Sequence, residues 1–79
     1  MISKEIIHKI ERNADSIVRI RIDNEYYHVE GFDFDRLGNL ITLYAFQLDE
    51  NDMYEGYEFS ANELTLHNIE LFKLAEIKE

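Results

Sequence analysis

The chain has 79 residues, with 46% apolar and 32% charged side chains, which predicts one globular domain over residues 1–79 with a single hydrophobic core. It contains no cysteine, which excludes disulfides and thiolate zinc sites, and it has neither a signal-peptide pattern nor an apolar run near the ~18 residues of a membrane span. These absences lead us to expect a cytoplasmic protein. The net charge of −9 opposes direct binding to nucleic acid or an anionic membrane, so we expect a cationic partner.

The first predicted element is a helix over residues 4–13. Ser3 is a suitable N-cap, and Ile2 would then pack on Ile7 as a hydrophobic staple. Asn13 is expected to end the helix in a left-handed conformation. The apolar residues at helical spacing are Ile6, Ile7, Ile10 and Ala14. They form one stripe, which predicts that the helix packs on a sheet.

Three strands are predicted between Ile17 and Leu48, with the sequences IVRIRID, EYYHVEGFDFD and NLITLYAFQLD. The first alternates, which places Val18, Ile20 and Ile22 on one face and Ile17, Arg19 and Arg21 on the other. The second changes its apolar parity at Gly31, which predicts a β-bulge there. The third is apolar on both faces, as in a central strand. Turns at 23–24 and 35–39 would join the three into a β-meander.

The rest of the chain is predicted to complete the sheet. Residues 49–55 (DENDMYE) are expected to form an extended, mobile loop, because their clustered acids repel one another. Tyr57 and Phe59 indicate a short fourth strand, and the spacing of Ser60 and Glu63 predicts a capping box with a helical turn over 61–64. A strand over 65–73 is favoured for the tail, with a last helix from Ile69 as the alternative. The predicted fold class is α+β, with an N-terminal helix packed on an antiparallel β-meander of about four to five strands.

The acidic residues are concentrated in the middle of the chain. Residues 1–21 contain five basic and three acidic side chains, whereas residues 22–72 contain 12 acidic side chains and one basic side chain, Arg36. The middle segment alone therefore carries a charge of −11. Such a field favours association with a basic surface.

No motif in the chain identifies a reaction. Asp33 and Asp35 share a strand face and could hold a divalent ion or act in acid–base chemistry, but a solvated strand face is the simpler interpretation. A calcium loop starting at Asp33 fails, because Tyr44 stands where the bidentate glutamate belongs. The three histidines, His8, His28 and His67, lack metal-ligand spacing. We therefore expect no cofactor, no metal and no enzymatic activity.

Aromatic residues interleave with the acidic ones, a composition typical of protein interfaces. Tyr26, Met53 and Tyr54 are the best exposed candidates, since hairpin tips and loops lie at the surface. The aromatic residues expected in the core are Tyr44, Phe34 and Phe59. The predicted partner-binding residues are Asp33, Asp35, Asp49, Glu50, Asp52, Met53, Tyr54 and Glu55.

The opening of the chain, SKEIIHKIERN followed by SIVRIRID and EYYHVEGFDFD, resembles that of small acidic phage proteins that inhibit CRISPR effectors. The resemblance covers under half the chain and rests on layout and acidity. It implies an inhibitor, acting in the cytoplasm of a bacterial host, whose acidic side chains imitate nucleic-acid phosphates. They would occupy the basic DNA groove of a CRISPR effector or another defence nuclease. The residues at matching places are Asp33, Asp35, Asp49, Glu50, Asp52 and Glu55. Arg19 and Arg21 depart from this acidic pattern and are expected to pair with Glu30 or Glu58 across the sheet.

Two functional interpretations follow. The first is a non-enzymatic inhibitor that binds a basic nucleic-acid-handling protein. The alternative is a small SH3- or Sm-like barrel that acts as a structural or self-assembling module, because a helix, about five strands and a helical turn (FSANEL) before the last strand suit that arrangement. The oligomeric state, monomer or dimer, stays open.

Overall fold

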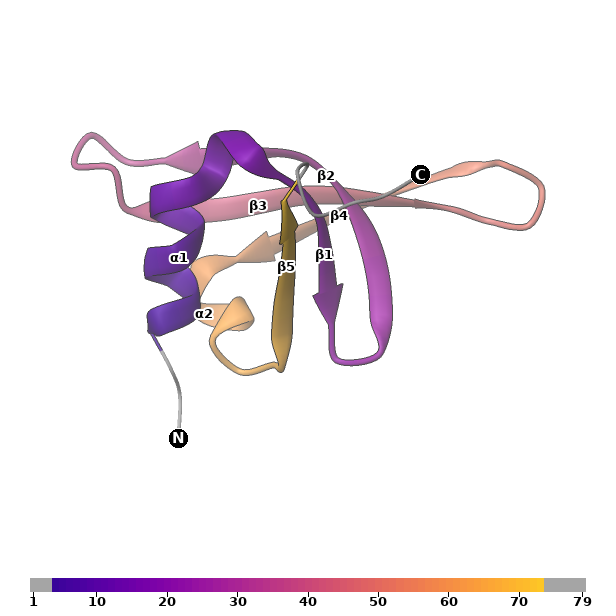
Figure 1. Ribbon diagram of the computed structural model, residues 1–79. Helices are drawn as coiled ribbons and strands as arrows, with labels where there is room; N and C mark the ends of the chain where they lie inside the picture. Colours follow the sequence, from indigo (N-terminus) through magenta and orange to yellow (C-terminus); the bar gives the residue numbers. More distant parts are fainter. Residues whose placement is uncertain (1–3, 74–79) are drawn as a thin grey trace.

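The computed structural model describes residues 4–73 as an α+β fold, which confirms the predicted class (Figure 1). No helix within these residues is long and apolar enough to cross a membrane. In chain order the elements are α1 (Glu5–Asn13), the 3-10 turn η1 (Ala14–Ser16), β1 (Ile17–Ile22), β2 (Glu25–Phe34), β3 (Leu40–Leu48), β4 (Tyr54–Ser60), α2 (Ala61–Leu64) and β5 (Ile69–Lys73).

The five strands form one antiparallel sheet with the order β4-β3-β2-β1-β5. Strands β1 to β4 follow one another as a meander, and β5 then returns to pair with β1 at the far edge. The third strand lies between β2 and β4, as its two apolar faces predict. Figure 1 shows β2 bending, so that β1 and β5 run across the direction of β3 and β4.

The core lies between the inner face of the bent sheet and the two helices. Its largest fully buried side chains are Ile10 of α1, Ile20 of β1, Leu43 of β3 and Leu64 of α2. Each such side chain contributes about 1.5–3 kcal/mol of hydrophobic stabilisation. The opposite face of the sheet, which bears Arg21, His28, Phe46 and Tyr54, is called the outer face below.

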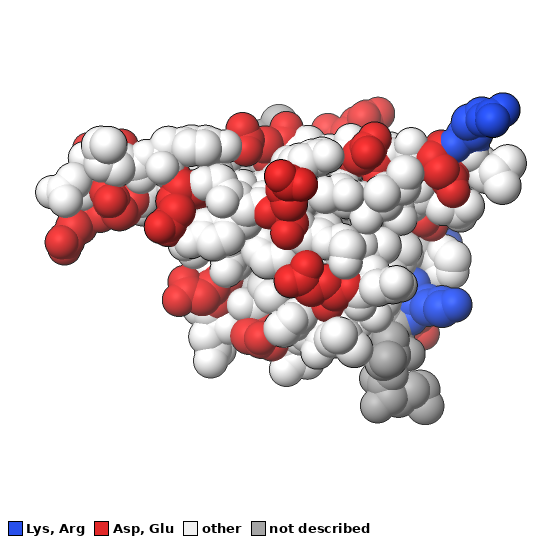
Figure 2. Space-filling model, turned by 180° about the vertical axis from the view of Figure 1, so that it is seen from behind, with Lys and Arg blue, Asp and Glu red and all other residues white. Residues whose placement is uncertain are grey.

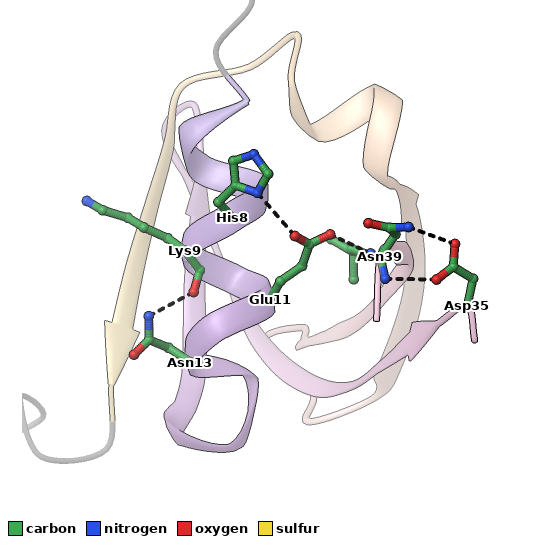
Figure 3. Close-up of polar contacts among 7 residues, drawn as sticks. His8, Lys9, Glu11, Asn13, Asp35 and Asn39 are labelled. Carbon is green, nitrogen blue, oxygen red and sulfur yellow. Dashed lines mark hydrogen bonds and ion pairs between the residues drawn. The ribbon is translucent and has the colours of Figure 1, made fainter. Parts of the chain in front are cut away.

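Helix α1 begins at Glu5, with Lys4 at the N-cap position and no side-chain cap. The predicted cap and staple, Ser3 and Ile2, lie outside the described residues. The predicted left-handed ending at Asn13 is wrong, because Asn13 has φ −126° and the chain continues into η1. The Asn13 side-chain amide instead donates to the carbonyl of Lys9 at 2.8 Å (Figure 3). The Asn13 side chain thus donates to a carbonyl near the helix end, which in a left-handed C-cap would accept a bond from a backbone amide.

Irregular pairing decides which strand residues enter the core. The predicted bulge at Gly31 is confirmed, because Val29 pairs with Ala45 while Gly31 pairs with Tyr44, which leaves Glu30 as the extra residue. The prediction that Ile17 faces away from Ile20 is wrong, since both are buried. Pairing between β1 and β5 shifts between Ile17 and Arg19, and this shift turns Ile17 inward.

The core assignment of the aromatic residues is correct in two of three cases. Phe34 and Phe59 are partly buried and pack against the core. Tyr44 lies between the buried Leu43 and Ala45 on β3, so its side chain is on the outer face, where it is half-buried.

Residues 49–73 contain more regular structure than their composition suggests. The prediction of an extended loop over 49–55 is wrong, because β4 begins at Tyr54 and only residues 49–53 form the turn. The predicted capping box is confirmed, with the Ser60 hydroxyl accepting from the Glu63 amide at 3.1 Å. Strand β5 begins only at Ile69, because residues 65–68 continue the turn after α2. The alternative of a helix from Ile69 is wrong, because Ile69–Lys73 is a strand. The rest of that alternative falls on residues 74–79, which lie outside the described part.

Candidate functional site

The predicted partner-binding residues lie in two groups at opposite ends of β3. Asp33 and Asp35 are at the β2–β3 end, and residues 49–55 are at the β3–β4 end, as Figure 1 shows. Strand β3 has nine residues, which span about 30 Å at ~3.3 Å per residue. The structure therefore does not bring the two groups together, and each has to be considered as a separate surface.

The β2–β3 turn is built around Asp35. Its Oδ1 accepts hydrogen bonds from the backbone amides of Leu37 and Asn39, both at 2.9 Å, and the Gly38 amide donates to its carbonyl at 3.1 Å. The side-chain amide of Asn39 donates to Oδ2 at 3.1 Å (Figure 3). The bonds from Asn39, backbone first, hold the pKa of Asp35 below its usual range. The Asp35 carboxylate thus shapes the turn.

The β3–β4 turn repeats this construction around Asp49. Its Oδ1 accepts from the amides of Asn51 at 2.8 Å and Met53 at 2.9 Å, and the Asp52 amide donates to its carbonyl at 2.9 Å. By contrast, the exposed carboxylates of Glu50 and Asp52 make no hydrogen bond within the described residues. The turn therefore holds two unpaired acids in a fixed conformation, together with the exposed Met53.

Three rings form a stacked row on the outer face beside this turn. His28 of β2 stacks on Phe46 of β3, with ring centroids 5.0 Å apart, and Phe46 stacks on Tyr54 of β4 at 5.4 Å. Gly56, which pairs with Phe46, makes this possible. A Cβ at Gly56 would lie only 3.0 Å from the Tyr54 hydroxyl, so the ring occupies the space over the glycine.

The hydroxyl of Tyr54 donates a hydrogen bond to the Glu30 carboxylate, and this bond raises the pKa of Tyr54. Glu30 is the extra residue of the β2 bulge, and Tyr54 is on β4, so the bond spans β3. The Tyr54 side chain is nevertheless 60% exposed. The ring is held in one orientation while much of its surface stays open.

Glu55 belongs to the other face of the hairpin. Its Oε2 accepts from the Tyr57 hydroxyl at 2.6 Å, and this bond chiefly raises the pKa of Tyr57 to about 12. The Tyr57 hydroxyl is also 3.2 Å from Oε1 of Gln47, whose amide donates to Glu25 at 3.2 Å. Glu55 therefore lies apart from the Tyr54 surface, although the two are adjacent in sequence.

Sequence reasoning missed the outer-face residues His28, Glu30 and Phe46. They share no motif, and they become neighbours of Tyr54 only through the register of three strands. The one local signal is Gly56, because a glycine two residues after an aromatic residue on a strand leaves room for the ring to lie flat.

Acidic side chains are spread across the face that Figure 2 shows, out to the end that carries the β3–β4 turn, while Lys and Arg side chains on this face gather at the opposite end. The predicted pairing of Arg21 with Glu30 or Glu58 is wrong. Arg21 pairs with Glu70 at 2.9 Å, because β5 is the neighbour of β1 and places Glu70 directly opposite. This ion pair neutralises the charge of Arg21, which is not part of the β3–β4 turn.

The aspartate of the first hairpin has a structural contact of its own. Asp23 Oδ2 lies 2.8 Å from Nδ1 of His67, and the Asn68 amide donates to Asp23 Oδ1 at 3.2 Å. The contact with His67 is the main cause of a lowered pKa for Asp23. Across residues 4–73, no three acidic or histidine side chains gather closely enough to hold a metal ion.

Comparisons of the chain with protein-family models, with curated proteins and with solved structures gave no significant match.

Proposed function

We propose that this protein is a non-enzymatic acidic inhibitor that binds the basic, nucleic-acid-binding surface of a partner protein, such as a CRISPR effector or another defence nuclease. The observation that supports this most is the distribution of charge. Residues 22–72 carry −11, and the acids are spread over a whole face of the molecule (Figure 2). Arginine and lysine side chains that bind nucleic-acid phosphates are attracted by carboxylates in the same way.

The β3–β4 turn is the best part of this surface for such binding. Asp49 fixes the turn from within, so Glu50 and Asp52 are presented without a large loss of backbone entropy on binding. Met53 and Tyr54, which are 64% and 60% exposed, add apolar contact area beside these charges. The acids make the surface complementary in charge to a basic partner, and the apolar side chains among them add surface that is removed from water on binding.

The experiment compares two variants that each lose one negative charge. Glu50→Gln removes a charge from the turn without breaking a hydrogen bond of the described structure, and Asp15→Asn removes one from the basic first part of the chain. Immobilised wild-type protein and both variants are incubated with bacterial lysate, and retained proteins are identified by mass spectrometry. The affinity of each retained protein is then measured with and without competing duplex DNA.

We expect the wild type to retain basic nucleic-acid-binding proteins that duplex DNA and added salt displace. Glu50→Gln should weaken this binding about two- to fivefold, the value of one exposed ion pair, and Asp15→Asn should leave it unchanged. Retention that is insensitive to salt, to DNA and to Glu50→Gln would contradict the proposal.

A second candidate function is a self-assembling module of the SH3- or Sm-like barrel type. It is favoured by the strand order, which leaves β4 and β5 at the two edges of the sheet with no pairing between them in the described part. Helix α2 also supplies the single helical turn before the last strand. Open edges carry unpaired backbone donors and acceptors, so β4 of one copy could pair with β5 of another.

A further inference from the structure

We infer that Tyr54 and Glu30 form an arginine-binding site on the outer face of the sheet. The open face of the Tyr54 ring would stack on a guanidinium group of the partner, and the Glu30 carboxylate would accept its hydrogen bonds. The inference rests on the proposed function and names the side chain of the basic partner that this surface recognises.

The Tyr54 ring is fixed before any partner binds. It stacks on Phe46 at an interplanar angle of 24°, lies over Gly56, and is tied through its hydroxyl to Glu30. A side chain held by three contacts loses little conformational entropy when a partner binds. Its 60% exposure shows that these contacts leave room for another planar group.

The charges around the ring select a cation. Glu30 accepts the tyrosine hydrogen bond through Oε1, and no contact in the described structure occupies Oε2. Glu58 lies two residues after Gly56 on β4, on the same face, opposite Tyr44. An aromatic face with carboxylates beside it attracts a cation through both the ring quadrupole and the negative charges.

Arginine fits this arrangement better than lysine. The guanidinium group is planar, so it can stack on the ring while its edge donates hydrogen bonds to a carboxylate. The lysine ammonium is compact and strongly hydrated, and it cannot make both contacts with the same geometry. A second copy of the chain is a poor occupant, because two molecules of charge −9 repel each other.

The test measures binding of two fluorescently labelled peptides of equal charge, hexa-arginine and hexa-lysine, by anisotropy at low and moderate salt. The variants of the site are Tyr54→Ala and Glu30→Gln. Their controls are Tyr26→Ala, which removes a tyrosine of similar exposure (53%) from β2, and Asp33→Asn, which removes an equal charge from the same strand. Thermal unfolding confirms the fold of each variant, and Tyr54→Phe retains the ring if Tyr54→Ala is unstable.

We expect the wild type to bind the arginine peptide about two- to fivefold more tightly than the lysine peptide, which is the value of an exposed cation–π contact. Tyr54→Ala and Glu30→Gln should remove this preference, while Tyr26→Ala, Asp33→Asn and Tyr54→Phe should retain it.

Equal binding of both peptides, weakened to the same degree by Glu30→Gln and Asp33→Asn, would overturn the arginine site but leave the charge-based proposed function standing. If neither peptide bound at low salt, both the arginine site and the proposed function would be overturned. Self-association of the wild type that Tyr54→Ala abolishes would assign the surface to a second copy and would also overturn the inference.

Discussion

The acidic residues of this protein have different structural roles, which the sequence alone does not distinguish. The carboxylates of Asp35 and Asp49 accept hydrogen bonds from the amides of their own turns, whereas the exposed Glu50 carboxylate has no partner among residues 4–73. A substitution that combines Asp49 with its neighbours would therefore disrupt the turn as well as the charge. The acidic surface is therefore best tested by substituting acidic residues whose side chains accept no hydrogen bond from the backbone.

Asp52 has a strained backbone conformation. It has φ 59°, and Gly38 occupies the matching position of the other turn with φ 85°. A residue with a Cβ is strained in this left-handed region, although aspartate tolerates it better than most, and glycine is not strained. The two turns thus solve the same backbone problem with different side chains.

We predict that Asp52→Gly raises the free energy of unfolding by roughly 0.5–1 kcal/mol, because the strain relieved exceeds the extra backbone entropy of glycine. Urea denaturation measures the change. Asp52→Asn is the matched control, since it removes the same charge and keeps the side chain. A stability of Asp52→Gly no higher than that of Asp52→Asn would show that the charge, and not the backbone conformation, is responsible.

At the scale of elements, a side chain of helix α1 hydrogen-bonds to the backbone of the sheet. Glu11 Oε2 accepts a hydrogen bond from the amide of Leu40, the first residue of β3, at 2.7 Å (Figure 3). Leu40 is buried and the Glu11 side chain is only 17% exposed, so this amide depends on Glu11 for its partner. Glu11 Oε1 also lies 3.3 Å from Nδ1 of the exposed His8.

We predict that Glu11→Ala lowers the free energy of unfolding by about 1–3 kcal/mol, the cost of leaving a buried donor without its acceptor. Glu11→Gln should lose less, because its amide oxygen can still accept. His8→Ala serves as the control, since an exposed pair contributes little. Denaturation curves give the stabilities, and amide hydrogen exchange at Leu40 reports the bond directly. Equal losses in Glu11→Ala and His8→Ala would disprove this role of the Leu40 bond.

Two local features of the fold were predictable, because a few neighbouring residues decide them. The bulge at Gly31 and the capping box of Ser60 and Glu63 each follow from a few consecutive side chains. The position of Ile17 was not predictable, because it depends on a register shift against β5, which lies about 50 residues later in the chain. The 49–53 turn was mispredicted, because its charges were counted without the hydrogen bonds that Asp49 makes.

For the whole molecule, the order of the strands and the net charge have opposite effects on self-association. Within the described residues the edges of β4 and β5 are open, which favours self-association, and the charge of −9 disfavours it. Salt acts on the two candidate functions in opposite directions. Screening weakens attraction to a basic partner, but it also weakens repulsion between copies of this chain.

We therefore predict a monomer of 9.5 kDa in sedimentation velocity experiments at low salt, with no closed ring forming as salt is raised. Under the same salt series, binding to a basic partner should weaken steadily. A stable closed ring that forms more completely at high salt, without a basic partner, would instead support the self-assembling module.

The sequence by itself determined the order of the helices and strands, the bulge and the charge of the middle segment, because propensity, side-chain parity and ionisation are local properties. It also identified Tyr54 and Met53 as exposed. Only the tertiary structure placed Glu30 beside Tyr54 and Glu70 beside Arg21. These relations depend on which strands pair and in which register, and pairing is decided by burial of the whole core rather than by any single segment.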